Sequence, residues 1–127
     1  MDGIIRDYRY LTGKAQMLPK WAYGYIQSKE QYYTAKELEE IVRHYRELNV
    51  PLDCVVQDWN TWNPGNWGEK ILDQSRYGDN KECMNRIHEM HAHTMVSVWP
   101  NMNAGGKNHQ EFFDAGYLLY DYATYDA

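Results

Sequence analysis

The 127-residue sequence is poor in cysteine, phenylalanine and proline, and it has no excess of positive charge. Its two cysteines, Cys54 and Cys83, stand in an apolar run and a helical pattern, which is typical of small buried side chains rather than of a disulfide or a metal pair. The 13 lysines and arginines are dispersed among 18 acidic residues, so no basic stripe is available to follow a phosphate backbone. We therefore expect no nucleic-acid partner.

Long hydrophobic runs are also missing. No apolar run approaches the roughly 20 residues that a membrane-spanning helix requires. The first residues, MDGIIRDYRY, lack the basic and then apolar layout of a signal peptide. We expect no membrane partner, and the sequence gives no indication of a compartment.

Tyrosine and tryptophan, in contrast, are abundant, with 12 and 5 copies against 2 phenylalanines. Both side chains combine a flat apolar face with a polar edge, which suits half-wet surfaces, including those that stack on sugar rings. The same side chains also fill protein cores. Composition alone leaves both interpretations open.

Three predicted strands alternate with three predicted helices along the chain. Alternating or valine-rich apolar patterns mark the strands, and capping residues or helical spacing mark the helix starts. The strands are expected at 21–28, 52–57 and 94–99, and the helices are expected to begin at Thr34, at Asp79 and near His109.

The first of these helices carries the clearest local signals. TAKE, residues 34–37, is a capping box in which the Thr34 hydroxyl accepts from the Glu37 N–H while the Glu37 carboxylate reaches back to Thr34. Pro51 prevents the helix from continuing. One face is predicted to be buried and the other solvated; the first consists of Leu38, Ile41, Val42, Tyr45 and Leu48, the second of Glu37, Glu39, Glu40, Arg43 and Glu47.

The β-α-β-α-β-α order predicts an α/β fold with parallel strands and right-handed crossovers. An open doubly wound sheet and part of a (β/α)8 TIM barrel both fit this order. No G-x-G-x-x-G motif follows the first strand, so a dinucleotide-binding sheet has no positive support. A whole barrel needs about 250 residues. Residues 1–127 are therefore predicted to form about the first three β/α units of a barrel.

Candidate site residues follow from the rule that ligands bind at the carboxyl ends of parallel strands. These ends are Gln27 to Lys29, Asp58 with Trp59, and Trp99 to Asn101. A carboxylate can accept hydrogen bonds from two neighbouring hydroxyls while an indole covers the C–H face of a sugar ring. The alternative is that Asp58 merely caps the loop that follows it, with Trp59 and Trp62 packed beneath it.

Two other polar features are interpreted as structural. Asp53 begins the second predicted strand, at the opposite end of the sheet, where side chains usually serve stability. HEMHAH, residues 88–93, is not an H-E-x-x-H motif, and only His88 and His91 would share a helical face. We therefore predict no metal site.

Beyond these patterns, the sequence resembles glycoside hydrolase family 31, the family of α-glucosidases and α-xylosidases, from about Tyr10 to its end. The resemblance is carried by G-Y-I-Q-S-K at residues 24–29, by V-P-L-D at 50–53 with Asp58 closing the strand, and by V-W-P-N at 98–101. The V-Q-D-W form at 56–59 is most similar to bacterial α-xylosidases, which remove xylose branches from xyloglucan oligosaccharides.

The resemblance implies a role for each matched residue. Asp58 would bind hydroxyls of the non-reducing-end sugar, and Trp99 would form an aromatic wall of the same subsite. Trp59 lies where family members differ in accepting or excluding the hydroxymethyl group of the sugar. Gln27 and Asn101, at neighbouring strand ends, complete the predicted substrate-binding set. Members of the family act in carbohydrate metabolism and need no metal or organic cofactor.

The sequence departs from the family pattern because it lacks the motif that carries the family's catalytic nucleophile. Family members carry their nucleophile in a W-x-D-x-x-E-like phrase, which is absent here, and their acid/base lies further on. Retaining hydrolysis needs two carboxyls about 5–5.5 Å apart. We therefore expect no catalytic residue in this segment and no activity from it alone, although a parent protein would be a glycosidase. An unpaired strand edge and an uncovered sheet face predict self-association.

Two alternatives remain at this stage. The first is a non-catalytic carbohydrate-binding or scaffold α/β domain, which explains the aromatic residues equally well but does not explain why YATYDA ends as if in mid-connection. The second is a small open-sheet protein with a metal at the histidine cluster.

Overall fold

The centre of the molecule is a parallel sheet of three strands in the computed structural model, which describes residues 1–119. β1 (Ile26–Gln27), β2 (Cys54–Gln57) and β3 (His93–Val96) lie in the order β1-β2-β3, so neighbours in the sequence are neighbours in the sheet. Consecutive units of a (β/α)8 barrel have this order. The predicted break at YATYDA falls outside the described residues.

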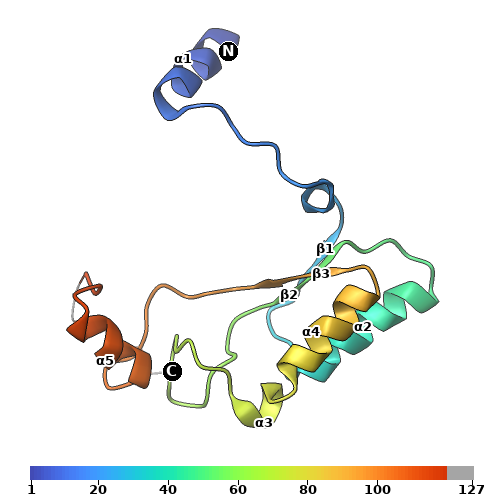
Figure 1. The fold of residues 1–127 in the computed structure, drawn as a ribbon, viewed down its shortest axis with the longest axis vertical. Helices are drawn as coiled ribbons and strands as arrows, with labels where there is room; N and C mark the ends of the chain where they lie inside the picture. Colours follow the sequence, from blue (N-terminus) through green and yellow to red (C-terminus); the bar gives the residue numbers. More distant parts are fainter. Residues whose placement is uncertain (120–127) are drawn as a thin grey trace.

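Two helices, α2 and α4, cover one face of this sheet, and the other helices lie beyond its ends. Figure 1 shows α2 and α4 side by side, whereas α1 stands away from the sheet at the end of an extended segment. Among residues 1–119, no helix is both long and apolar enough to cross a membrane. The helices are α1 (Asp2–Thr12), the 3-10 helix η1 (Lys20–Tyr23), α2 (Ala35–Glu47), α3 (Gln74–Tyr77), α4 (Asn80–Glu89) and α5 (Lys107–Asp114).

The hydrophobic core lies between the sheet and the pair α2 and α4. Leu38 and Val42 of α2 pack with Val55 of β2 and Ile87 of α4, and all four side chains are buried. Because side chains alternate along a strand, the residue after Val55 points to the opposite face. On that face Met95 of β3 is 40% exposed. The helices therefore cover the face of β2 that carries Val55, whereas β3 is largely exposed, with Val96 47% accessible as well.

The capping box at the start of α2 is confirmed in one half and wrong in the other. The Thr34 hydroxyl accepts from the Glu37 N–H at 3.1 Å, as predicted. The Glu37 carboxylate, however, accepts from the Tyr33 N–H at 2.7 Å and from the Lys29 ammonium at 2.7 Å, not from Thr34. The Lys29 ammonium and the Tyr33 N–H occupy one carboxylate oxygen of Glu37 each. The Glu37 carboxylate therefore links the segment after β1 to the start of α2.

The end of α2 comes earlier than Pro51 alone would require. Asn49 adopts the left-handed conformation (φ 55°), which asparagine tolerates better than most residues, and it turns the chain away after Glu47. Leu48, predicted to lie on the buried face, is therefore 59% exposed.

The first strand is much shorter than its alternating pattern predicts. Lys20–Tyr23 form the 3-10 helix η1, and only Ile26 and Gln27 pair with β2. The ring of Trp21 stacks on that of His93, with centroids 4.3 Å apart, while Tyr23 points to solvent. Strand pairing begins only where β2 offers a partner, so the alternation at Trp21 and Tyr23 does not mark a strand.

Two α-helices have no counterpart in the sequence prediction. α1 buries no side chain. α3 lies in the long segment after β2 and begins at Asp73, whose carboxylate accepts from the Ser75 N–H and hydroxyl at 2.9 and 2.6 Å and pairs with Arg76. These hydrogen bonds from Ser75 and Arg76 lower the pKa of Asp73 to about 2.

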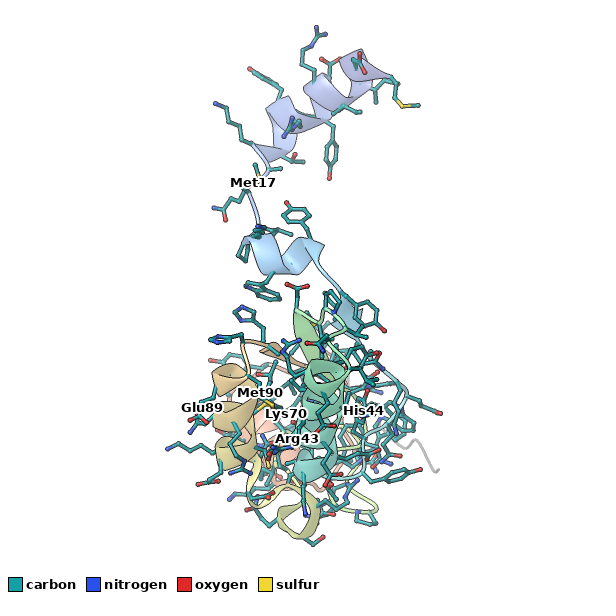
Figure 2. All side chains as sticks on the ribbon, turned by 90° about the vertical axis from the view of Figure 1, so that its right-hand side faces the viewer. Met17, Arg43, His44, Lys70, Glu89 and Met90 are labelled. Atoms are coloured by element: carbon teal, nitrogen blue, oxygen red, sulfur yellow. The ribbon has the colours of Figure 1, made fainter. Side chains whose placement is uncertain are left out.

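The predicted solvated face of α2 is wrong at Glu39, which is only 5% exposed. Its carboxylate accepts from the Arg86 guanidinium of α4 at 2.7 Å and pairs with Arg43 of its own helix. Figure 2 shows α2 and α4 side by side with Arg43 labelled. Burial alone would raise the pKa of Glu39, but the hydrogen bond and charge of Arg86, together with the charge of Arg43, outweigh it and lower the pKa.

This arrangement predicts an acid-sensitive contact between α2 and α4. Because the folded-state pKa lies below the ordinary value of 4.5, the stabilisation by Glu39 is complete above that pH and is lost as the pH falls through the lowered pKa. Glu39→Gln should therefore destabilise the chain near neutral pH and flatten the acid dependence of its free energy of unfolding, measured by urea denaturation between pH 6 and pH 3.

The matched control is Glu40→Gln, one position along the same helix, where the carboxylate is 61% exposed and lies 3.8 Å from Lys36. Exposed pairs of this kind contribute little. Equal acid profiles for the two variants would contradict the proposed bridge.

Candidate functional site

The site is assembled at the carboxyl ends of β2 and β3, which meet at one edge of the sheet. Asp58 directly follows β2, and its Oδ1 accepts from the Trp59 N–H at 2.8 Å. This bond is the loop cap that the alternative interpretation required. The second carboxylate oxygen, Oδ2, has no hydrogen-bond partner among residues 1–119, and the side chain is half-buried. One oxygen thus holds the loop and the other is available to a ligand.

Four of the five tryptophans form one cluster in the loops that follow β2 and β3. The ring centroid of Trp59 lies 6.0 Å from that of Trp99 and 5.6 Å from that of Trp67, and the Trp67 and Trp99 rings meet edge to face at 5.3 Å. Trp62 is buried, with its centroid 6.4 Å from that of Trp59, whereas the other three are partly exposed. The structure therefore brings together the predicted site residues Trp59 and Trp99 with Trp62, which was expected only as packing beneath the loop, and with Trp67, which was not predicted.

The tryptophans are held by contacts between the long loop after β2 and the loop after β3. The Lys70 ammonium donates to the backbone carbonyls of Trp99 and Gly68, and burial lowers the pKa of this lysine. The Asn103 N–H donates to the Trp67 carbonyl at 2.9 Å. The bonds from Lys70 to Trp99 and from Asn103 to Trp67 cross from one loop to the other.

Further bonds tie the long loop to the start of α5. The Glu69 carboxylate accepts from the Lys107 N–H at 3.1 Å, and the Asn108 side-chain oxygen accepts from the Lys70 N–H at 2.8 Å. The N-terminus of a helix presents unpaired N–H groups, so the Glu69 carboxylate is well placed there. The loop after β2, the loop after β3 and the start of α5 are thus held together by hydrogen bonds.

Gly68 packs directly against the backbone of the loop after β3. It has a left-handed backbone (φ 72°), and a Cβ at this position would lie 1.9 Å from the Asn101 carbonyl oxygen. Only glycine fits here without displacing a backbone. The contact uses the backbone of Asn101, while its half-buried side chain makes no hydrogen bond within the described part of the chain.

Gln27 lies at the end of β1, but its side chain is not brought to Asp58. Its carbonyl oxygen accepts from the hydroxyls of Tyr25 and Tyr45 at 2.6 and 2.8 Å, and its amide nitrogen lies 3.2 Å from the Tyr32 hydroxyl. Gln27 pairs in register with Val55, whose side chain faces the helices. The amide thus links β1 to α2, which contributes Tyr45.

Asp53 and the histidine cluster at residues 88–93, which the sequence analysis interprets as structural, lie away from this site. Asp53 Oδ2 accepts from the Tyr25 N–H at 3.1 Å at the start of β2. His88 and His91 do not share a helical face, since α4 ends at Glu89 and His91 is left-handed (φ 57°). No group of three His, Cys, Asp or Glu side chains within residues 1–119 is placed to hold a metal ion.

Most of the chain matches one protein family. A family model described as the TIM-barrel domain of glycosyl hydrolases family 31 matches residues 15–126. The chain belongs to glycosyl hydrolase family 31. The matched range covers all three strands and the whole site, and it excludes α1.

Members of family 31 with known names or structures are similar to most of this chain. An α-xylosidase of Saccharolobus solfataricus is 40% identical over 114 residues, covering 90% of this chain and 15% of that protein. The crystal structure of an α-xylosidase from Xanthomonas citri superposes with a TM-score of 0.82 at 40% identity, covering 88% of this chain and 12% of that one.

A third family 31 structure, an α-xylosidase from a soil metagenome complexed with xylose, has a TM-score of 0.76 at 34% identity; it covers 84% of this chain and 15% of its own. The present chain therefore spans only about one seventh of these relatives, as the 15% shares show.

Proposed function

We propose that this chain supplies part of the glycone pocket of a retaining α-glycosidase that removes terminal non-reducing α-xylosyl, or α-glucosyl, residues from oligosaccharides. One observation carries the proposal. Asp58, with an oxygen unused by the described residues, directly precedes Trp59, whose partly exposed ring lies 6.0 Å from that of Trp99 in the loop that follows the adjacent parallel strand. In a family 31 barrel, this is the end where ligands bind.

The site residues have distinct proposed roles. Asp58 accepts hydrogen bonds from neighbouring sugar hydroxyls, Trp99 walls the ring, and Trp59 lies where a hydroxymethyl group would have to fit. Asn101 offers an amide at the rim. To contact a sugar, the Gln27 amide would have to break its hydrogen bonds with the hydroxyls of three tyrosines. We therefore propose that this side chain stabilises the position of β1 instead.

The bond-breaking carboxyls are proposed to lie outside these 127 residues. A retaining glycosidase needs one carboxyl to attack and another to protonate the leaving oxygen, about 5–5.5 Å apart. Asp58 alone cannot do both, and the sequence has no W-x-D-x-x-E phrase. The small share of each relative that the chain spans supports a longer parent protein.

Xylose is the preferred sugar in this proposal. The three relatives described above are named α-xylosidases, and one of them was crystallised with xylose. Xylose and glucose differ by a single hydroxymethyl group, so the choice depends on the space beside Trp59.

The proposal is tested by release of nitrophenol from aryl α-xyloside and aryl α-glucoside. The purified chain, with its mass verified, should show no turnover, and a longer protein containing it should prefer the xyloside. Turnover that follows the chain and disappears in Asp58→Asn would place Asp58 in a carboxyl pair and contradict its binding role. A longer protein that is inactive on both substrates would instead favour a non-catalytic carbohydrate-binding domain.

We further propose that the isolated chain associates with itself. Within the described residues β3 pairs only with β2; its apolar side chains Met95 and Val96 are 40 and 47% exposed, and Val98 in the following loop is 68% exposed. Open edges and apolar faces of this kind promote association. Sedimentation should show species larger than a monomer, and Met95→Lys should reduce them; a compact monomer at every concentration would contradict the proposal.

A further inference from the structure

A hollow of about 380 Å³ lies between the long loop after β2 and the segment that begins at the end of β3. Apolar side chains form most of its wall, and the side chain of Lys70 also lines it. Trp99 lines it too, whereas Asp58 and Trp59 do not. The apolar wall consists of Trp62, Leu72, Val96, Val98 and Phe112.

We infer that Lys70 and this hollow form a covalent modification site for aromatic aldehydes, in which the ε-amino group forms an imine and the hollow holds the ring. The inference does not rest on the proposed function, because it uses only the amine and the apolar wall beside it. It predicts that Lys70 reacts faster than a lysine that is paired with a carboxylate.

The surroundings of Lys70 favour its unprotonated form. Its donors are directed to the backbone carbonyls of Gly68 and Trp99, which carry no net charge, and no carboxylate within residues 1–119 pairs with it. The neighbouring Glu69 carboxylate is engaged elsewhere, since it accepts from a side-chain amide at 2.9 Å and from the Lys107 N–H at 3.1 Å. Burial therefore lowers the pKa of Lys70, which leaves more of the amine nucleophilic.

Loss of a proton leaves both carbonyl contacts of Lys70 intact. An ammonium has three N–H groups, whereas a neutral amine has two N–H groups and one lone pair. Two N–H groups are enough for the Gly68 and Trp99 carbonyls, so the lone pair takes the third direction. The fold thus fixes the position of the amine and leaves its lone pair available for a new bond.

Imine formation at this amine needs only the aldehyde. The lone pair of the Lys70 Nζ attacks the carbonyl carbon and forms the C–N bond. The carbonyl oxygen takes up the two protons that the nitrogen loses and leaves as water, so that a C=N bond replaces the C=O bond. The Lys70 side chain is exposed, and an aldehyde therefore reaches it from solvent.

The hollow suits a flat aromatic ring. Its volume lies in the range of about 300–1,000 Å³ that is usual for small-molecule sites. Trp62 and Phe112 contribute aromatic surface to the wall. Val96 and Val98 are 47 and 68% exposed, so a bound ring removes their apolar surface from water together with its own.

The competing interpretation is that Lys70 only ties the two loops together. Its ammonium would then be protected by the Gly68 and Trp99 carbonyls, and Lys70 would react more slowly than other exposed lysines. This interpretation explains the two hydrogen bonds. It does not explain why an apolar hollow adjoins the amine.

The decisive measurement is the rate at which benzaldehyde and acetaldehyde label each lysine of the 127-residue chain. Cyanoborohydride supplies a hydride that converts each imine to a stable secondary amine, which peptide mass spectrometry locates. Lys29 is the internal reference, because it is also exposed but its ammonium pairs with Glu37 at 2.7 Å, which raises its pKa. Benzaldehyde should label Lys70 at least about tenfold faster than Lys29, and acetaldehyde should discriminate less, because it has no ring to bury.

Variants of the hollow sharpen the test. Phe112→Ala removes part of the wall and should slow benzaldehyde labelling of Lys70 several-fold while leaving acetaldehyde labelling unchanged. Phe113→Ala is the matched control, since Phe113 is the next residue of α5, is 54% exposed and lies outside the lining. Dispersed NMR signals of the five indole N–H groups verify that each variant is folded. A low protein concentration keeps self-association from covering Val96 and Val98.

Labelling of Lys70 no faster than that of Lys29 would overturn the inference and leave Lys70 as a tie between loops. Equal benzaldehyde rates for the Phe112→Ala and Phe113→Ala variants would also contradict it, because the ring would then lie elsewhere. Neither result concerns Asp58, so the proposed glycone site is judged separately by the nitrophenol assay.

Discussion

Asparagine in place of Asp58 should weaken binding of the terminal sugar by roughly 10- to 100-fold. Hydrogen bonds to a charged acceptor contribute about 1.5 to 3 kcal/mol, and the amide replaces one acceptor oxygen by a donor. The remaining amide oxygen can still accept from the Trp59 N–H, so the loop cap survives. Xylose titrations monitored at the Trp59 and Trp99 indoles measure the effect, and kcat/KM of a longer protein should fall in parallel.

Asp53→Asn provides the matched control for this substitution. It makes the same chemical change at the other end of β2, where the carboxylate accepts from the Tyr25 N–H. We expect it to lower stability and to leave sugar affinity unchanged. If instead Asp58→Asn lowered stability and left sugar affinity intact, Asp58 would be only a loop cap.

Gly68→Ala is expected to cost at least about 2 kcal/mol of stability and to displace Trp99. The left-handed backbone alone disfavours alanine by about 1 to 2 kcal/mol. The new Cβ would also lie 1.9 Å from the Asn101 carbonyl oxygen, so one of the two loops must move. Urea denaturation measures the first effect, and the indole signals of Trp67 and Trp99 report the second.

Gly65→Ala separates the two causes. Gly65 lies in the same loop and is also left-handed (φ 83°), but a Cβ there would meet no atom within 4 Å. It should lose only the 1 to 2 kcal/mol of the backbone conformation and leave the Trp99 signal in place. Equal losses and equal spectra for the two variants would mean that the contact with Asn101 does not hold the loops together.

Local signals predict β2, the position of β3 and most of α2, although β3 ends at Val96, three residues before the predicted end at Trp99. The Thr34 hydroxyl caps the helix as expected, and Leu38 and Val42 lie in the core. The valine-rich runs of β2 and β3 are short and apolar, which left little choice of conformation. In these segments the sequence pattern and the final packing favour the same structure.

The sequence-based predictions are wrong where a contact with a residue far away in the chain determines the local structure. Glu39 lies in an acidic stretch that looks solvated, but Arg86 approaches from α4, 47 positions later in the chain. Likewise β1 is limited by its pairing with β2, not by the alternation of its own side chains. No pattern within these segments contains that information.

The site is predicted only in part, because some of its residues are brought together by contacts between distant loops. Asp58, Trp59 and Trp99 follow from the ends of predicted strands. Trp62 and Trp67 belong to a long loop without periodicity, and they join the cluster only because the loops after β2 and β3 are bonded to each other.

This bonding has a consequence for engineering. Gly68, Glu69 and Lys70 connect three consecutive positions of one loop to the next loop and to the first turn of α5. Transplanting the tryptophan-lined rim onto another barrel of family 31 would therefore require residues 58–73 and 97–108 to be exchanged as one cassette. Either segment moved alone would leave Trp99 and Trp67 without the partners that orient them.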